Sequence, residues 1–266
     1  MLLYVHSAGR GHLPLPTLDT LLASKHANIV RLVVQAAEVR KYAPHINKLP
    51  DTEQLIVLPP KIKRLSPTRQ WLLENCPSNK MILFDDDLAF AVRRKDDITK
   101  FRPAEPADIT RMIDMLHDYL DRYVHVGLMA REGGNRIKTD AKGKPVKHLE
   151  AIRMMRVLGY NRGNMCGAPR FDRLPTKQDF DMTLQLLRTG YPNAVITEFV
   201  HNQAGSNTEG GCSAYRDEAM MARSAELLRK LHPDYVKVVT KETKSAWGGG
   251  ERVDVQISWK KALANG

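Results

Sequence analysis

Short apolar runs alternate with helical patterns through the first hundred residues. Four runs are continuous enough to predict buried strands, at residues 2–5, 29–34, 54–58 and 81–84. Short helices are predicted between them, at residues 17–23, 38–42 and 67–75. Strands that alternate with helices in this way are typical of a twisted, largely parallel sheet. This half predicts a Rossmann-like α/β unit, although it contains neither a Gly-x-Gly-x-x-Gly motif nor a P-loop.

The second half predicts a different mixture of elements. Apolar residues at helical spacing indicate helices at residues 106–120, 176–188 and 216–231. Strands are predicted at residues 124–130, 194–200, 235–240 and 252–259, the last two as an antiparallel pair. Thr17 and Thr176 are the expected N-caps of their helices. Since no linker rich in Pro, Gly or Ser divides the chain, we predict one α/β domain over residues 1–266 with a mixed central sheet.

Three consecutive aspartates close the fourth predicted strand. Asp85, Asp86 and Asp87 follow the apolar run directly, at the edge where ligands bind in open α/β sheets. In an extended segment, Asp85 and Asp87 point to one side and Asp86 to the other. Two carboxylates on one side suit Mg²⁺ or Mn²⁺, with water and a diphosphate as the remaining ligands. The alternative is a solvated acidic turn, but the buried strand before the aspartates favours the metal site.

The chain is strongly basic. Its 41 Lys and Arg residues exceed its 30 Asp and Glu residues, which leaves a net charge of +11. Such an excess favours a polyanionic partner, either nucleic acid or an anionic membrane, over a merely soluble basic protein. Part of it lies in the polar, glycine-containing segment 131–148, in Arg131, Arg136, Lys138, Lys142, Lys144 and Lys147. We predict a mobile basic loop or hairpin there, which either contacts nucleic acid or is a solvated surface segment.

Cysteine usage and hydropathy bear on the location of the protein. Cys76, Cys166 and Cys212 are widely spaced, and their odd number argues against a disulfide framework. The apolar N-terminus is too short for the core of a signal peptide, and no apolar run approaches the length of a membrane span. We therefore expect a cytoplasmic protein without a membrane partner.

Six short motifs occur in order along the chain. They are YVHSAGR at 4–10, TRQW at 68–71, FDDD at 84–87, HVG at 125–127, DFDMTLQLL at 179–187 and GGCS at 210–213. Together they resemble the TET/JBP-associated glycosyltransferases of phages, which belong to the enzymes with the GT-A fold. The resemblance extends over roughly residues 2–261. It implies a single GT-A-like domain with a nucleotide-sugar-binding half, residues 1–100, and an acceptor-binding half, residues 101–266.

The resemblance also implies an activity. A sugar would pass from a nucleotide sugar, usually a UDP-sugar in this fold, to the hydroxymethyl group of a modified pyrimidine such as 5-hydroxymethylcytosine. The acceptor would be phage DNA in the cytoplasm of an infected bacterial host. A hydroxymethyl group lies in the major groove, so either the base flips out or a loop enters the groove. The basic segment 131–148 is the predicted contact with the phosphates.

The metal ligands follow from the same resemblance. The aspartate triplet matches the Asp-x-Asp motif, with Asp87 as the direct ligand of Mn²⁺ or Mg²⁺ and Asp85 closer to the ribose or sugar. Asp86 is a further candidate, because a triplet leaves the register open. A second ligand is expected late in such folds, and His201 follows the strand predicted to end at residue 200. Its imidazole suits Mn²⁺ better than Mg²⁺, and the alternative is a surface histidine bonded to the next loop.

The catalytic base is expected at the start of a helix on the acceptor side. Asp179 is the candidate, and partial burial would raise its pKa toward the working range of a general base. The alternative is that Asp179 only stabilises the helix dipole. If no base is used, the enzyme is a retaining one.

The remaining candidates concern the donor. The loop after the first strand is placed against the nucleotide base and ribose, through His6, Ser7, Ala8, Gly9 and Arg10. Glu38 follows the second strand and is placed to bond the base or ribose, while Arg69 is placed to bind the diphosphate bidentately. Both residues have an alternative role in surface salt bridges. The loop 162–164 is a candidate wall of the sugar pocket.

Three other functions compete with DNA glycosylation. The first is a GT-A transferase acting on a carbohydrate or protein. The second is a metal-dependent DNA-processing hydrolase, since clustered aspartates also serve two-metal hydrolysis. The third is a DNA-binding protein without catalysis, in which the aspartates are structural.

Overall fold

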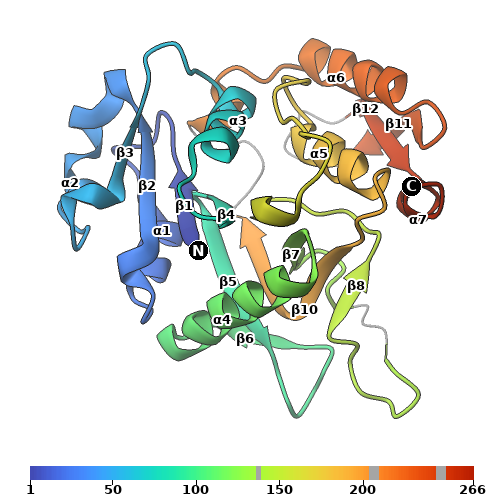
Figure 1. The fold of residues 1–266 in the computed structure, drawn as a ribbon, viewed down its shortest axis with the longest axis horizontal. Helices are drawn as coiled ribbons and strands as arrows, with labels where there is room; N and C mark the ends of the chain where they lie inside the picture. Colours follow the sequence, from blue (N-terminus) through green and yellow to red (C-terminus); the bar gives the residue numbers. More distant parts are fainter. Residues whose placement is uncertain (136–138, 204–209, 244–249) are drawn as a thin grey trace.

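The computed structural model describes residues 1–266 except 136–138, 204–209 and 244–249. Its main strands are β1 Leu2–His6, β2 Val30–Gln35, β3 Leu55–Leu58, β4 Lys80–Asp85, β5 Leu88–Arg93, β6 Phe101–Pro103, β7 His125–Ala130, β8 His148–Glu150, β9 Val157–Asn161 and β10 Asn193–Gln203. Within the described residues these form one ten-stranded sheet in the order β3-β2-β1-β4-β9-β7-β10-β5-β6, with β8 paired to β10. Strands β1 to β4 are parallel, whereas β9 and β5 run against their neighbours. The predicted α/β domain with a mixed sheet is observed (Figure 1).

Helices cover both faces of the sheet. They are α1 Pro16–Leu22, α2 Ala43–Ile46, α3 Leu65–Asn75, α4 Pro106–Arg122, α5 Gln178–Leu187, α6 Glu218–Leu231 and α7 Trp259–Ala264. One core lies between the sheet and helices α1 and α4, and includes Leu3 and Val5 of β1. A second core lies between the sheet and helices α3 and α5, and includes Tyr4. Because successive residues of β1 enter opposite cores, the whole strand is apolar, as expected for a parallel strand buried on both faces.

Four strands were not in the predicted set, namely β5, β6, β8 and β9. Strand β9 is a short segment that gains its conformation by pairing with both β4 and β7, and such tertiary pairing has no local signal. The chain turns at Asp86 and Asp87 before β5 begins at Leu88. The triplet is therefore not the extended segment expected from the sequence, and the predicted alternation of its side chains does not hold.

Both predicted helix caps are wrong. Helix α1 follows Leu15, and the Thr17 hydroxyl inside it accepts a hydrogen bond from the Leu88 amide at 2.8 Å. Helix α5 begins after Lys177, which has φ +61° and makes no side-chain cap. Thr17 therefore links α1 to the start of β5, next to the aspartates, and does not cap its own helix.

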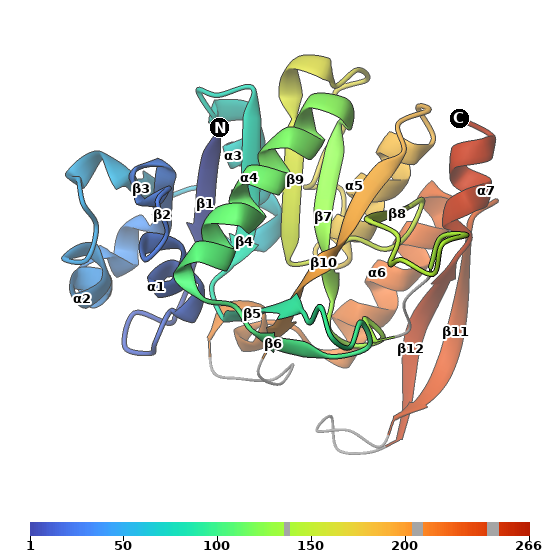
Figure 2. The same cartoon turned by 90° about the horizontal axis from the view of Figure 1, so that it is seen from below.

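The C-terminal residues form a unit beside the main sheet (Figure 2). Strands β11 Val236–Thr243 and β12 Gly250–Ile257 pair antiparallel, as predicted. Val236 and Val255 join Ala225 and Leu228 of α6 in a third core. Helix α7 begins at Trp259, the last residue of the strand predicted over residues 252–259. This unit packs on α5, the helix that carries Asp179.

Two further expectations from the sequence concern membrane-spanning helices and disulfides. No helix in the described residues is long and apolar enough to cross a bilayer. Cys76 and Cys166 are free thiols, the first buried and the second exposed. The side chain of Cys212 lies outside the described part.

Candidate active site

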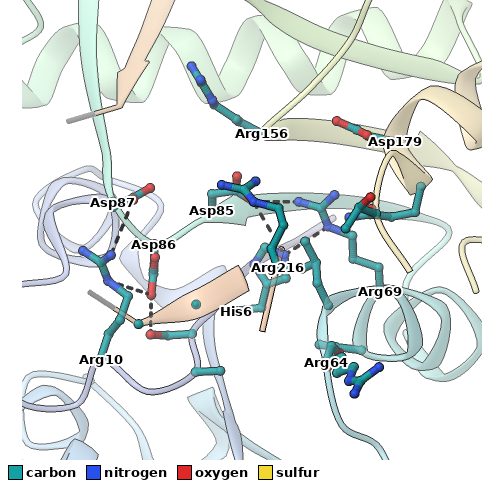
Figure 3. A pocket seen from close by; sticks show the side chains of 18 of the residues that line it. His6, Arg10, Arg64, Arg69, Asp85, Asp86, Asp87, Arg156, Asp179 and Arg216 are labelled. Atoms are coloured by element: carbon teal, nitrogen blue, oxygen red, sulfur yellow. Dashed lines mark hydrogen bonds and ion pairs between the residues drawn. The ribbon is translucent and has the colours of Figure 1, made fainter. Parts of the chain in front are cut away.

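A cavity of about 300 Å³ opens at the carboxyl ends of β1, β2 and β4 (Figure 3). Four acidic residues line it, namely Asp85, Asp86, Asp87 and Asp179. Six cationic residues also line it, namely Arg10, Arg64, Arg69, Arg156, Lys177 and Arg216. Cations thus exceed carboxylates by two (six minus four), so the lining favours a polyanionic ligand while holding negative groups for a metal or a proton.

The side of the cavity around Arg69 is closely hydrogen bonded. Parallel pairing places His6 of β1 beside Asp85 of β4, and the Arg69 guanidinium spans both, at 2.6 Å from Asp85 Oδ1 and 3.1 Å from His6 Nε2. Because the Arg69 Nε–H only donates, His6 Nε2 accepts and its Nδ1–H donates to the Phe84 carbonyl at 2.6 Å. Burial lowers the pKa of His6 to about 3, so the ring is neutral. The Asp85 carboxylate is thereby paired with a buried cation.

The side around Arg10 holds the other two aspartates more loosely. Arg10 Nε lies 3.5 Å from Asp86 Oδ2, and Arg10 Nη1 lies 3.6 Å from Asp87 Oδ2. Ser7 donates to Asp86, while Gln203 Nε2 lies 2.8 Å and 3.0 Å from the two Asp87 oxygens. Burial raises the pKa of Asp86 to about 7 and also raises the pKa of Asp87, and neighbouring carboxylates add to both shifts. Burial therefore disfavours the ionised forms of Asp86 and Asp87, and a bound cation would favour them.

A divalent cation fits Asp86 and Asp87 better than the complete triplet. In the described part of the chain, the three aspartates do not place one carboxylate oxygen each within 4.8 Å of the other two. Asp85 also commits one oxygen to Arg69. Two adjacent carboxylates with raised pKa values, beside a cavity suited to a polyanion, match the preference of Mg²⁺ or Mn²⁺ for oxygen ligands.

A convergent ligand group elsewhere does not form a comparable site. His117, Asp118 and Asp121 lie on the solvent side of α4. The Lys80 ammonium is 2.5 Å from Asp121 and 3.2 Å from the His117 ring. A lysine thus already supplies the cation there.

Asp179 lines the same cavity from the first turn of α5 (Figure 3). Burial raises its pKa; the Arg69 charge acts against this shift, and the Asp85 charge adds to it. Its Oδ1 accepts a hydrogen bond from the Phe180 amide at 3.0 Å, which orients the carboxylate. A carboxylate of raised pKa on the cavity wall has the chemistry of a general base.

His201 does not lie on this cavity. Strand β10 continues to Gln203, so His201 pairs with Phe90 and Ala130 inside the sheet and is fully buried. Neither ring nitrogen has a hydrogen-bond partner among the described residues, and burial lowers the pKa of His201 to about 3. The expected surface histidine is thus wrong, and the residue of β10 that contacts the aspartates is Gln203.

The loop after β1 divides between lining and support. His6, Ser7, Ala8 and Arg10 line the cavity, whereas Gly9 does not. The Gly9 amide donates to Glu38 Oε2 at 2.9 Å, and the Gly211 amide donates to the Ala8 carbonyl at 2.8 Å. Gly9 has φ +69°, a conformation that favours glycine. In this structure Glu38 supports the loop from outside the cavity.

Two other predicted segments lie away from the cavity. The loop 162–164 follows β9, whose last residue pairs with Lys80 at the start of β4. The aspartates lie at the other end of β4. Arg162 donates there to the Ser78 carbonyl at 3.2 Å, so the loop is not a wall of this cavity. In the basic segment, Arg131, Lys142, Lys144 and Lys147 are exposed. Arg136 and Lys138 lie outside the described residues.

Several lining residues had no signal in the sequence. Arg156 precedes the unpredicted strand β9, has φ +64°, and accepts a hydrogen bond at its carbonyl from the Asp85 amide at 3.0 Å. Arg64 also has a positive φ, of +66°, and lies over the ring of Tyr215. Their positions depend on tertiary pairing and on unusual backbone conformations, neither of which hydropathy reports.

Solved structures share this fold at low sequence identity. A Staphylococcus aureus TarS 1–349 structure in complex with UDP-GlcNAc is 12% identical, with a TM-score of 0.52 over 86% of this chain and 67% of that one. The mannosyltransferase PcManGT from Pyrobaculum calidifontis, in complex with GDP-Man and Mn²⁺, is 14% identical, with a TM-score of 0.52 over 88% of this chain and 64% of that one. The present chain thus spans about two thirds of each neighbour. The predicted GT-A-like fold is confirmed.

Sequence comparisons identify the family. No curated protein matches the chain significantly. A family model described as TET-Associated Glycosyltransferase matches residues 1–211, and this range includes the loop after β1, the aspartate triplet, Arg69 and Asp179. Because the match covers well over half of its length, the chain belongs to the TET-associated glycosyltransferase family.

Proposed function

We propose that this glycosyltransferase moves a sugar from a nucleotide sugar, with UDP-sugar as the expected donor, to the hydroxymethyl group of 5-hydroxymethylcytosine in phage DNA. The observation that carries the proposal is the single cavity in which the aspartate triplet, the arginines and Asp179 meet. The TarS complex with UDP-GlcNAc and the PcManGT complex with GDP-Man support a nucleotide-sugar donor. The reaction would occur in the cytoplasm of the infected host.

The donor diphosphate binds among the cationic side chains. Arg10 and Arg69 lie on either side of the triplet and can each pair with phosphate oxygens. Asp87, with Asp86 beside it, would hold Mn²⁺ or Mg²⁺, and the ion when bound offsets charge on the departing diphosphate. Asp85, already paired with Arg69, faces the ribose or the sugar. The Mn²⁺ in the PcManGT complex supports a divalent cation in the reaction.

The acceptor proton passes to Asp179. Its raised pKa makes the carboxylate a stronger base than a solvated aspartate, and it acts in its ionised form. The hydroxyl oxygen of the acceptor then attacks the anomeric carbon as the bond to the diphosphate breaks. The Arg69 charge acts to lower the pKa of Asp179 and so favours the ionised carboxylate.

DNA as the acceptor agrees with two features of the chain. The net charge of +11 favours a polyanion, and Arg131, Lys142, Lys144 and Lys147 are exposed for contact with phosphates. The family description, TET-Associated Glycosyltransferase, names an association with TET, and the resemblance of the chain to this family implies hydroxymethylated pyrimidines as acceptors.

Mass analysis of nucleosides tests the proposal. DNA containing 5-hydroxymethylcytosine is incubated with the protein, Mn²⁺ and a panel of UDP-sugars, then digested. We expect a hexose- or pentose-sized mass gain that disappears with EDTA. If the DNA nucleosides gain no mass but the protein transfers the sugar to a carbohydrate or protein acceptor, the alternative acceptor class is correct.

A further inference from the structure

The hairpin β11–β12 carries opposite chemistry on its two faces. The paired residues Val236 and Ile257, and Val238 and Val255, lie on the face that packs against α6. The other face is open, and its described residues include the exposed Lys237 together with Lys241, Arg252 and Asp254. This hairpin follows residue 211, where the family match ends.

Three cations, two of them on this face, surround one carboxylate. Lys241 Nζ lies 2.8 Å from Asp254 Oδ2, Arg252 Nη2 lies 3.4 Å from the same oxygen, and Lys177 Nζ lies 3.4 Å from Oδ1. Although burial acts to raise it, the hydrogen bond from Lys241 helps to hold the pKa of Asp254 at about 2. The three cations and one carboxylate leave a net charge of +2, and Lys237 raises it to +3.

Lys177 joins this face to the cavity. Lys177 lines the cavity and precedes Asp179 by two residues in the sequence. Its side chain is almost fully buried against Asp254. The open face of the hairpin therefore continues the cationic lining outward from the acceptor side. Lys237 and Lys241 are four residues apart on one strand, roughly 13 Å, so the face is long enough to meet more than one phosphate of a nucleic-acid strand.

We propose that the open face of the β11–β12 hairpin, with Lys237, Lys241 and Arg252, binds the sugar-phosphate backbone of the DNA acceptor and holds the target base beside Asp179. The inference rests on the proposed function and adds a surface outside the part of the chain that matches the family. Asp254 and Lys177 connect the bound backbone to the helix that carries the base. The charges of Lys241 and Arg252 that Asp254 does not neutralise pair with phosphates.

Salt-dependent DNA binding is the test. Fluorescence anisotropy is measured for a hydroxymethylcytosine oligonucleotide with wild-type protein and with the variant Lys237→Ala/Lys241→Ala/Arg252→Ala. Since each phosphate contact contributes about 0.9 to the slope of log K against log salt, we expect the slope to fall by about 2 to 3. The ratio of kcat/KM for the oligonucleotide to that for the free nucleoside is expected to fall about tenfold or more.

Matched variants separate charge from folding. Lys25→Ala/Lys48→Ala/Lys100→Ala removes three exposed lysines that do not line the cavity, and the salt slope should stay near the wild-type value. Lys237→Arg/Lys241→Arg/Arg252→Lys keeps the charges and should retain both slope and ratio. An unchanged slope and ratio in the alanine variant would overturn the inference while leaving the proposed function intact. Wild-type protein that neither binds nor glycosylates DNA would overturn both.

Discussion

The two sides of the cavity hold their carboxylates in different ways. Around Arg69, Asp85 has a buried guanidinium at 2.6 Å, and that guanidinium is itself oriented by His6. Around Arg10, the ion-pair distances to Asp86 and Asp87 are 3.5 Å and 3.6 Å, and both carboxylates have raised pKa values. Asp85 is paired with a buried cation, whereas burial disfavours the ionised forms of Asp86 and Asp87, which a bound cation would favour. In the proposed function, the Arg69 side therefore serves positioning and proton transfer, and the Arg10 side holds the metal.

The largest effect is expected at Asp179. The substitution Asp179→Asn removes the base with little change of shape, and kcat should fall roughly 10³-fold. Because only the ionised carboxylate accepts the proton, the wild-type rate should rise with pH through the raised pKa of Asp179, and this acidic limb should be missing in the variant. The pH profile of kcat with saturating donor measures both effects. Donor binding should be retained, and a variant with full activity would exclude Asp179 as the base.

The next effect separates the two sides directly. Asp87→Ala should lower kcat roughly 10²-fold and weaken Mn²⁺-dependent binding of UDP. Asp85→Ala is the matched control, since Asp85 is paired with Arg69; it should lower kcat but leave the Mn²⁺ concentration for half-maximal UDP binding unchanged. Isothermal calorimetry at several Mn²⁺ concentrations makes the comparison. Equal loss of metal affinity in both variants would show that the two sides share the ion.

The sequence predicted the parts of this site that depend on local pattern. An apolar strand followed by carboxylates placed Asp85, Asp86 and Asp87 at the correct edge, and motif resemblance placed Arg69 and Asp179 in the same cavity. The division of the triplet between two arginines was not predicted, because it arises from a turn at Asp86 that follows no hydropathy rule.

His201 shows why late residues were harder to place. The strand was expected to end at residue 200, which would have released His201 into a loop. Pairing of β10 with β7 shifts register between Ile196 and Val200, and pairing with β5 extends the strand to Gln203. A bulge of this kind changes which side chains face a cavity, and it depends on two partner strands, one of them unpredicted. The role of His201 as a metal ligand stays a prediction without support from this geometry.

A smaller effect is expected from the support of Arg69. In His6→Leu the Arg69 Nε–H loses its buried acceptor, and an unsatisfied buried donor costs about 1–3 kcal/mol. We expect kcat/KM to fall about tenfold, together with a lower Tm. His6→Gln is the matched variant, because an amide can accept from Arg69 and donate to the Phe84 carbonyl, and it should recover most of the activity. If His6→Leu and His6→Gln behave alike, orientation of Arg69 by the ring is not important.

The smallest effect concerns stability on the Arg10 side. The pKa of Asp86 is raised to about 7 in the folded protein, above its value of 3.8 in an unfolded chain, so the folded state binds the additional proton between these values. Its contribution to stability is complete below pH 3.8 and is lost as pH rises through 7. Integration between pH 6.5 and 8 gives a loss of about 1 kcal/mol, or roughly 2–4 °C in Tm.

Bound Mn²⁺ and substitution of Asp86 should both reduce this loss of stability between pH 6.5 and 8. Three buried histidines do not obscure it, since the pKa values of His6, His125 and His201 are lowered to about 3 or 4 and their linkage lies mainly below pH 6.5. Metal-free Asp86→Asn should therefore show a smaller decline of Tm over this range than the wild type, whereas Asp85→Asn should keep most of the decline. Saturating Mn²⁺ should flatten the wild-type curve, because an ion on Asp86 and Asp87 favours their ionised form. If Mn²⁺ left the decline unchanged, the cation would have to bind elsewhere, and the contrast between the two sides would reflect burial alone.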